Sequence, residues 1–343
     1  MVLRIRTIRE DTIGVNASRR YVLWALCVVL ALVGTIFLSS CGGGGLFGGG
    51  GNLSSSVPVD SDLRTNPGNP RENTPLVLVS EQPGTSLVGS YSTVTLDYSN
   101  AAYGYFCVQS YLESRVAVKV YAPDGSLYPP FFLTPSESNI TIPFSEGNGQ
   151  YHVLVYENLY GNDYTGLFSL YIDVQLADEF APFLYSNQYV YFTDGDDAVR
   201  LSQIVTENAT SDLEAVEQIY MWVVQSISYD YDKAANVAPG YLPNNSNTLR
   251  TEDGICFDFA SLAASMMRAQ RLPTKLTIGY CGSAYHAWID VYTTEQGWIR
   301  KKIEFPGGTY VRMDPTFDSA SKGRGDISKI IGDGTNYSPM FHY

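Results

Sequence analysis

Three side chains in the second half of the chain, Cys256, His286 and Asp314, have the types and the order that nucleophilic catalysis by a thiol requires. Cys256 opens a run to Gln270 that contains no glycine or proline and is rich in alanine, leucine and methionine, which predicts a buried helix. The thiol would then lie in the first helical turn, where the helix dipole and the free backbone N–H groups favour an anion. Such surroundings lower the pKa of a thiol from about 8.5 to between about 3.5 and 7.5. The same N–H groups can hold the oxyanion of an acyl-transfer intermediate.

His286 is the candidate base for this thiol, because the chain has only three histidines. From His286 to Tyr292 the residues alternate, which places the histidine on one face of a predicted strand and apolar side chains on the other. The apolar face is expected to contact the core, so the histidine is expected to point toward a polar cleft. Asp314 ends another strand-like stretch and can orient the imidazole from its far nitrogen. The three residues then act as nucleophile, base and orienting carboxylate.

Plainer interpretations are open for several of these residues. A single cysteine in an apolar helix is usually a small core residue, and a single histidine on a strand is usually structural. His152 is expected to be a packed or edge histidine, and Cys107 is expected to be buried. Cys281 either belongs to an ordinary hairpin or approaches the nucleophile as a redox partner. With Cys41 set aside, three cysteines remain in the rest of the exported part, so no disulfide framework is predicted.

The elements that must position these residues are predicted from local patterns. A boundary is expected near residues 194–196. Ser211 to Glu214 forms a capping box, and apolar residues then follow at helical spacing as far as Ile227, so one stripe of this helix faces a core. The stretch Thr274 to Tyr280 is a short strand that can lie next to the histidine strand.

Residues 76–195 predict a different kind of structure. Short runs alternate between apolar and polar residues, as at Val116 to Tyr121, and turn residues such as Pro123 to Ser126 separate them. Several short strands at this spacing indicate an antiparallel β-sandwich. No nucleophile or cluster of acids or histidines stands out in it, so a spacer or substrate-docking module is the expectation.

The chemistry-bearing segments resemble the core pattern of the transglutaminase-like superfamily over roughly residues 198 to 318. The residues that carry the resemblance are, in order, Gly254 to Ala260, Arg268, Leu272–Pro273, Gly279–Tyr280, His286 to Trp288, Gly297–Trp298 and Asp314 to Thr316. The resemblance implies a papain-like α+β fold in which a cysteine helix packs on an antiparallel sheet. It also implies that Cys256 is the nucleophile, His286 the general base and Asp314 the orienting residue.

Two features are less well matched to the family. The stretch from Ile299 to Val311 lengthens the interval between the histidine and the aspartate, and it is interpreted as a hairpin insertion. The family often has an aromatic oxyanion donor upstream of the cysteine. Tyr241 is the first candidate for that donor.

The N-terminal sequence is typical of an export signal. Arg19 and Arg20 precede an apolar run from Tyr21 to Leu38, which ends in Leu38-Ser39-Ser40-Cys41. This ending resembles the bacterial lipobox, in which the cysteine is lipidated and the preceding peptide is removed. We therefore expect a signal peptide over residues 1–40, a lipid such as palmitate on Cys41, and an extracytoplasmic protein anchored to the cell membrane. The alternative is a single-pass membrane anchor, since about 20 apolar residues span a bilayer.

The remaining boundaries follow from composition. Residues 41–75 are rich in glycine, serine, asparagine and proline and are interpreted as a flexible linker. The β-sandwich is placed at residues 76–195, the catalytic domain at 196–320 and a C-terminal tail at 321–343. The net charge of −13 argues against binding to nucleic acid.

The function expected from the sequence is attack on amide bonds of a protein or peptide substrate through a thioester, with no metal or organic cofactor. Water as the acceptor would make the protein a cysteine peptidase or amidase, which is the first interpretation because no amine channel is evident. A lysine amine as the acceptor would make it a cross-linking acyltransferase. A non-catalytic surface binding protein is the alternative from another class.

Overall fold

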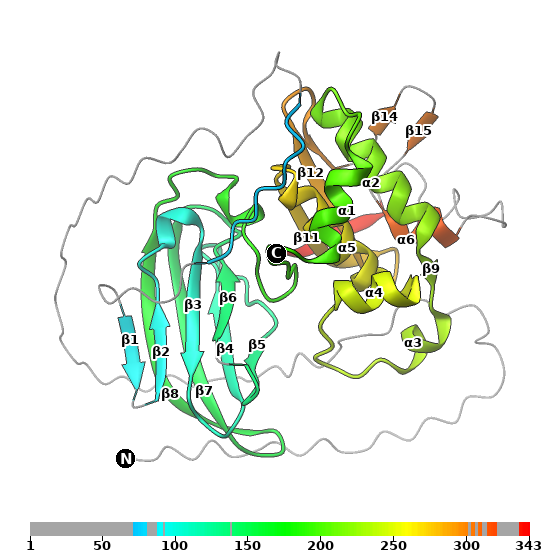
Figure 1. Ribbon diagram of the computed structural model, residues 1–343. Helices are drawn as coiled ribbons and strands as arrows, with labels where there is room; N and C mark the ends of the chain where they lie inside the picture. The colour runs from blue at the N-terminus through cyan, green and yellow to red at the C-terminus, as the bar shows by residue number, and fades with distance from the viewer. Residues whose placement is uncertain are drawn as a thin grey trace.

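The structure is a computed structural model that describes residues 71–80, 88–91, 93–137, 139–300, 303–305, 308–310, 314–320 and 336–343. The predicted signal peptide, Cys41 and most of the predicted linker lie outside these residues. Figure 1 shows a β-rich part beside a mixed part of helices and strands. Among the described residues, no helix has the length and apolarity needed to cross a membrane.

The β-rich part is a sandwich of two antiparallel four-stranded sheets, as predicted. The first sheet has the order β1 (Val88–Tyr91), β2 (Val94–Asp97), β3 (Tyr105–Ser110) and β6 (Asn139–Pro143). The second has the order β5 (Phe131–Leu133), β4 (Val116–Tyr121), β7 (Gly149–Tyr160) and β8 (Asp163–Val174). In β4 the valines are fully or almost fully buried while Lys119 and Tyr121 are partly exposed, which is the alternation of a strand with one core face. The 3₁₀ helices Ala101–Tyr103 and Ala181–Phe183 precede β3 and follow β8.

The mixed part is built around a four-stranded antiparallel sheet. Its order is β13 (Gly297–Ile299), β12 (Ala284–Thr293), β11 (Thr274–Cys281) and β16 (Tyr337–His342). The helices are α1 (Asp197–Val205), α2 (Asp212–Ser226), α3 (Tyr231–Asn236), α4 (Asn245–Thr251), α5 (Cys256–Ala269) and α6 (Pro315–Ala320). Two small pairings complete it, between β9 (Ser228–Tyr229) and β10 (Asp253–Gly254) and between β14 (Ile303–Phe305) and β15 (Gly308–Tyr310). The second pairing is the predicted hairpin.

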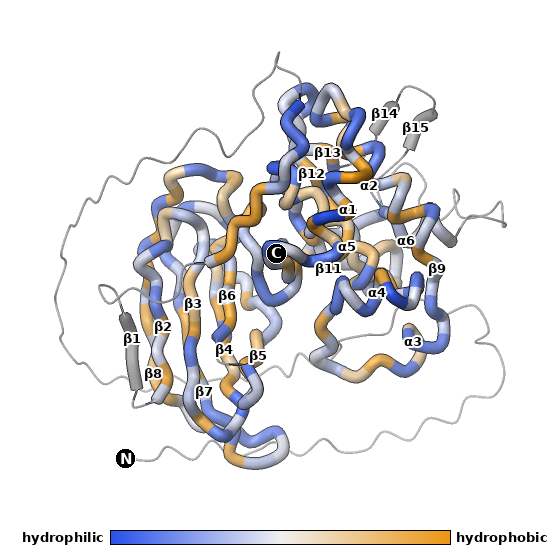
Figure 2. Tube along the Cα trace, viewed as in Figure 1, coloured by the Kyte–Doolittle hydropathy of each residue, from blue (hydrophilic) through white to orange (hydrophobic). Residues whose placement is uncertain are grey.

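Helix α5 is the centre of the mixed part. It contacts β11 and β12 of the sheet and also α1, α2, α4 and α6. All of its residues are buried, so the absence of glycine and proline and the many small apolar residues suit a helix with no solvent-facing stripe (Figures 1 and 2). The one arginine in it, Arg268, donates hydrogen bonds to the backbone carbonyl oxygens of Thr274, Tyr185 and Tyr343 at 2.6 to 3.0 Å. Burial lowers the pKa of Arg268 to about 9.

The predicted C-terminal tail at residues 321–343 is wrong for its last part. Residues 337–342 form β16, which pairs with β11 and so belongs to the central sheet. Tyr343 is fully buried, and its ring contacts Tyr128 and Phe131 of the β-sandwich. The sequence did not indicate this strand, because three exposed residues separate the buried Tyr337 and Phe341 and because Pro339 suggests a loop. Pro339 is tolerated because the ladder shifts register there.

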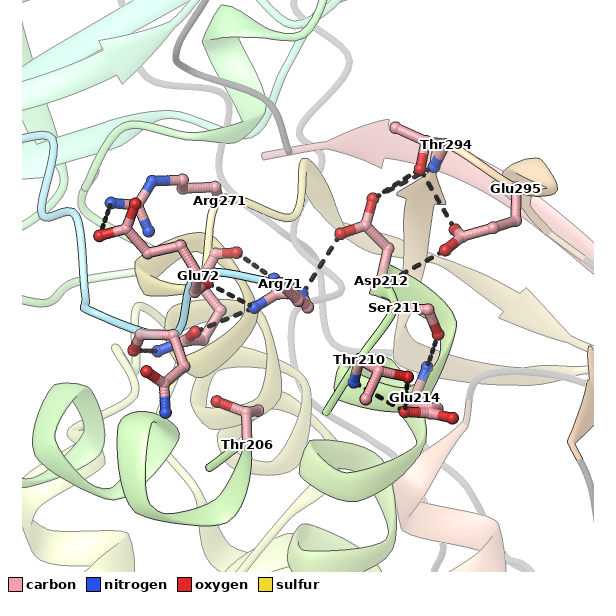
Figure 3. A network of polar contacts seen from close by, with 12 residues as sticks. Arg71, Glu72, Thr206, Thr210, Ser211, Asp212, Glu214, Arg271, Thr294 and Glu295 are labelled. Carbon is pink, nitrogen blue, oxygen red and sulfur yellow. Dashed lines mark hydrogen bonds and ion pairs between the residues drawn. The ribbon is translucent and has the colours of Figure 1, made fainter. Parts of the chain in front are cut away.

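The predicted linker also ends earlier than its composition suggests. Arg71 lies across the ends of α5 and α2, as Figure 3 shows. Its guanidinium donates to the backbone and side-chain oxygens of Gln270 and forms a buried ion pair with Asp212 at 3.3 Å. Asp212 in turn accepts a hydrogen bond from the Thr294 hydroxyl at 3.0 Å. Loss of one partner from a buried pair typically costs about 3–5 kcal/mol, so Arg71 is part of the folded unit.

Candidate active site

Cys256 is the first residue of α5, as predicted. The preceding Ile255 is extended, and Gly254 allows the backbone to turn into the helix at close range. A Cβ atom at Gly254 would lie 2.7 Å from the Cβ of Asp258, so a larger residue would collide with the first turn of the helix. Cys256 keeps 9% of its surface exposed. The residue is thus buried, and its place in the first turn puts it at the positive end of the helix dipole.

A polar cluster around Asp258 fixes this first turn. The carboxylate is fully buried and accepts hydrogen bonds from the Ile255 backbone N–H at 2.9 Å and from the Lys233 ammonium at 2.6 Å. Its second oxygen accepts the hydroxyl hydrogen of Tyr241 at 2.5 Å. The cluster thereby ties α3 and the loop that leads to α4 onto the start of the cysteine helix.

The same cluster holds the hydroxyl of Tyr241, the candidate oxyanion donor, against Asp258. Burial, followed by the charge of Asp258, raises the pKa of Tyr241, so its phenol stays protonated. A phenol has one hydrogen to donate, and in this structure Tyr241 donates it to Asp258. The Tyr241 hydroxyl can serve an oxyanion only if it leaves that carboxylate.

His286 and Asp314 are in direct contact. His286 lies on β12 opposite Gly279 of β11, and Asp314 immediately precedes α6. The Nε2 atom of His286 lies 2.6 Å from Oδ2 of Asp314. His286 is 1% exposed and Asp314 is not exposed at all. The histidine faces the polar groups Asp314 and Cys256, and at the histidine itself the predicted polar cleft is closed to solvent.

The charge state of His286 follows from its partners. Burial alone would lower its pKa, but the charge and hydrogen bond of Asp314 oppose burial and prevail. A hydrogen bond with Cys256 and the charge of that residue raise the pKa further, to about 10 in total. His286 is therefore protonated near neutral pH, with Nε2 donating to the carboxylate of Asp314 and Nδ1 left for the thiol. The imidazole thus joins Cys256 and Asp314.

Two aromatic residues that the sequence did not single out as site residues enclose the pair. The Tyr337 hydroxyl donates to the same Oδ2 of Asp314 at 2.8 Å. The buried Trp288 ring lies parallel to the His286 ring with centroids 6.2 Å apart, and it meets the Tyr337 ring edge-on at 5.0 Å. Trp288 carried a signal, because it follows the histidine within the family pattern. Tyr337 carried none, because it lies in the segment interpreted as a tail.

The other candidate residues lie apart from the reaction chemistry. Cys107, Cys256 and Cys281 are buried, and no disulfide joins these three described cysteines, so Cys281 is not bonded to the nucleophile. Cys281 accepts a weak hydrogen bond from the Asn336 amide at 3.7 Å. His152 stacks on Tyr171 of the neighbouring strand at 4.2 Å, as expected of a packed histidine. Within the described ranges, no group of three or more His, Cys, Asp or Glu residues could hold a metal ion.

Comparison with known proteins confirms the family resemblance for this part of the chain. Residues 199–303 match the family model of the transglutaminase-like superfamily. The match contains Cys256 and His286 and ends before Asp314. The α+β core preceded by a β-sandwich is the predicted fold class, and it is confirmed.

Individual relatives are distant. UPF0252 protein MJ1282 of Methanocaldococcus jannaschii is 30% identical over 88 residues, which are 22% of this chain and a quarter (25%) of that protein. A candidate cysteine protease from Cytophaga hutchinsonii has a similar structure with a TM-score of 0.37 and 16% identity, covering 68% of this chain and 72% of that one. The transglutaminase of red sea bream gives a TM-score of 0.28 and 11% identity over 57% of this chain and 47% of that one. Likenesses this low carry no argument about activity.

The raised pKa of His286 predicts how the pair contributes to stability. A group whose pKa is higher in the folded state stabilises the fold fully below its unfolded pKa, about 6.5, and loses that contribution as the pH rises through the folded value. We expect Asp314→Asn to lower stability most near pH 6 and least near pH 10, where His286 is losing its proton. Urea unfolding of the unaltered chain and of Asp314→Asn, under reducing conditions and with Cys256 present in both, measures the difference. A gap that is constant between pH 6 and pH 10 contradicts the buried ion pair.

Proposed function

We propose that the chain is a thiol enzyme that attacks amide bonds, with Cys256 as nucleophile, His286 as general base and Asp314 as orienting residue. The observation that carries the proposal is the 2.6 Å contact between His286 Nε2 and Asp314 Oδ2. Cys256 forms a hydrogen bond with the same imidazole. A buried imidazole held on one side by a carboxylate and on the other by a thiol at a helix N-terminus is the arrangement that activates a cysteine.

The first chemical step forms a thioester. The imidazole takes the thiol proton of Cys256, and the sulfur attacks the carbonyl carbon of an amide. The carbonyl oxygen becomes an oxyanion, and the first backbone N–H groups of α5 are the donors that can bind it, since helix termini leave such groups without intrahelical partners. His286 then returns the proton to the leaving nitrogen as the C–N bond breaks.

The second step resolves the thioester. His286 takes a proton from the acceptor, the acceptor attacks the thioester carbon, and the thiol leaves with the proton that His286 returns. Water as the acceptor gives a carboxylic acid, so the protein is then a peptidase or amidase acting on proteins or peptides. We propose hydrolysis as the activity. A lysine amine as the acceptor would give a cross-link instead.

The fate of one glutamine residue separates the two acceptors. The full chain is incubated with a glutamine-bearing peptide, with and without an excess of a primary amine, and the products are identified by mass spectrometry. We expect a shortened or deamidated peptide in both reactions, and at least a hundredfold loss of product with Cys256→Ala, because the nucleophile is then missing.

The same reactions identify the results that oppose the proposal. An amine adduct as the main product would replace hydrolysis with acyl transfer. Product formation that persists unchanged in Cys256→Ala would overturn the thiol mechanism, and Cys107→Ala is the matched control that should leave product formation intact.

We also propose that the enzyme is exported and anchored to the membrane by a lipid on Cys41. The support is the lipobox-like sequence from Leu38 to Cys41 after an apolar run. A bacterial host fed an alkyne-bearing fatty acid should produce a chain that carries the label, and Cys41→Ala should abolish labelling. A chain that is unlabelled, or labelled equally in Cys41→Ala, would argue against the anchor.

A further inference from the structure

We propose that Tyr337 is a positioning residue that holds Asp314 in place for His286, so that the site works with four groups in series. The inference rests on the proposed function. Its central observation is that one carboxylate oxygen, Oδ2 of Asp314, receives two contacts, from His286 Nε2 at 2.6 Å and from the Tyr337 hydroxyl at 2.8 Å.

The path of the chain brings Tyr337 to this carboxylate. Tyr337 opens β16 and pairs with Cys281, the last residue of β11, so its place is set by the sheet and not by a loop. Gly279 of β11 makes this approach possible. A Cβ atom there would lie 2.1 Å from the Ser338 carbonyl oxygen and 2.9 Å from the Trp288 ring. The close packing of β16 on β11 therefore requires a glycine.

The ring of Tyr337 is held as firmly as its backbone. The residue is 7% exposed and packs edge-on against Trp288, which itself lies over His286. A phenol fixed in this way has little freedom to turn its hydroxyl away from Asp314. The hydrogen bond is therefore part of the preorganised site.

The chemistry of the phenol suits a permanent donor. Burial, followed by the charge of Asp314, raises the pKa of Tyr337, so the hydroxyl stays protonated near neutral pH. Among the described residues, His286 from β12 and Tyr337 from β16 are titratable groups in contact with Asp314. Cys256 of α5 lies beyond the imidazole, and Cys281 of β11 lies beside the phenol.

Two donors on one oxygen have a definite effect on the site. Hydrogen bonds to the charged form of a carboxylate favour that form, and a carboxylate with a fixed rotamer orients the imidazole that bonds to it. Without the hydroxyl, Asp314 would turn more freely and would hold the protonated imidazole less firmly in place. The ion pair of imidazolium and thiolate would then collapse at a higher pH.

The pH dependence of the reactivity of Cys256 tests this effect. The rate of alkylation of Cys256 by iodoacetamide is measured in the full chain between pH 4 and pH 10, by mass spectrometry of the peptide that contains it. In Tyr337→Phe we expect the acidic midpoint of this profile to rise by about one pH unit, which is what the loss of one hydrogen bond to a charged group implies. The alkaline part should change little.

Controls separate positioning from mere packing. Tyr151→Phe removes another buried hydroxyl, one that bonds to the Gly147 carbonyl at 3.0 Å within the β-sandwich, and its profile should match that of the unaltered chain. In an Asp314→Asn background, Tyr337→Phe should add no further shift, because the group through which it acts has been removed. The proposal is overturned if Tyr337→Phe slows alkylation equally at every pH and leaves the acidic midpoint unmoved. It is also overturned if Tyr337→Phe shifts that midpoint by the same amount whether Asp314 is present or replaced by asparagine.

Two further results keep the inference distinct from the proposed function. If Asp314→Asn leaves the profile unchanged, the catalytic assignment itself fails. If Asp314→Asn moves the profile and Tyr337→Phe does not, only the role of Tyr337 fails. Should Tyr337→Phe not fold, 3-fluorotyrosine at position 337 keeps the ring and strengthens the donor, so the acidic midpoint should fall. An unmoved midpoint in that protein contradicts the proposal.

Discussion

The proposed chemistry of the mixed part depends on one buried contact, the hydrogen bond between His286 and Asp314. An ion pair with no exposure to water is costly to form, and it persists only where further donors and close packing compensate for lost hydration. Both groups meet these conditions: Tyr337 adds a second donor to the carboxylate, and the buried Trp288 ring packs next to the imidazole. Strands β12 and β16 carry these two residues and so place them beside the contact.

The second constraint is the position of the thiol. Cys256 must face the same imidazole from the start of a helix, so α5 has to begin at one particular residue. Gly254 and the carboxylate of Asp258 fix that point, since Asp258 binds the Ile255 N–H, Lys233 and Tyr241 together. At the other end of α5, Arg268 binds the carbonyl oxygens of Tyr185 and Tyr343 and so joins the helix to its surroundings. The cysteine helix is held at both ends.

Sequence patterns predicted what is local in this arrangement. The helix from Cys256, the strand with His286 and the hairpin before Asp314 each follow from a continuous stretch of residues, and the family resemblance suggested the roles proposed for them. Contacts between distant segments were not predictable. Arg71 meets Asp212 across 141 positions, and its glycine- and proline-rich surroundings indicated a tether. Tyr337 reaches Asp314 through a strand that contains Pro339, and nothing in its own sequence marks it.

Trapping the acyl intermediate tests most directly whether His286 and Asp314 activate the thiol of Cys256. The full chain is mixed with p-nitrophenyl acetate, quenched in acid after a short interval, and digested for mass spectrometry. The account predicts one acetyl group, on Cys256, which forms far more slowly in His286→Ala and is absent from Cys256→Ser. Acetylation that is absent, or that reaches Cys107 and Cys281 as fast as Cys256, would contradict the claim that the buried pair activates this thiol.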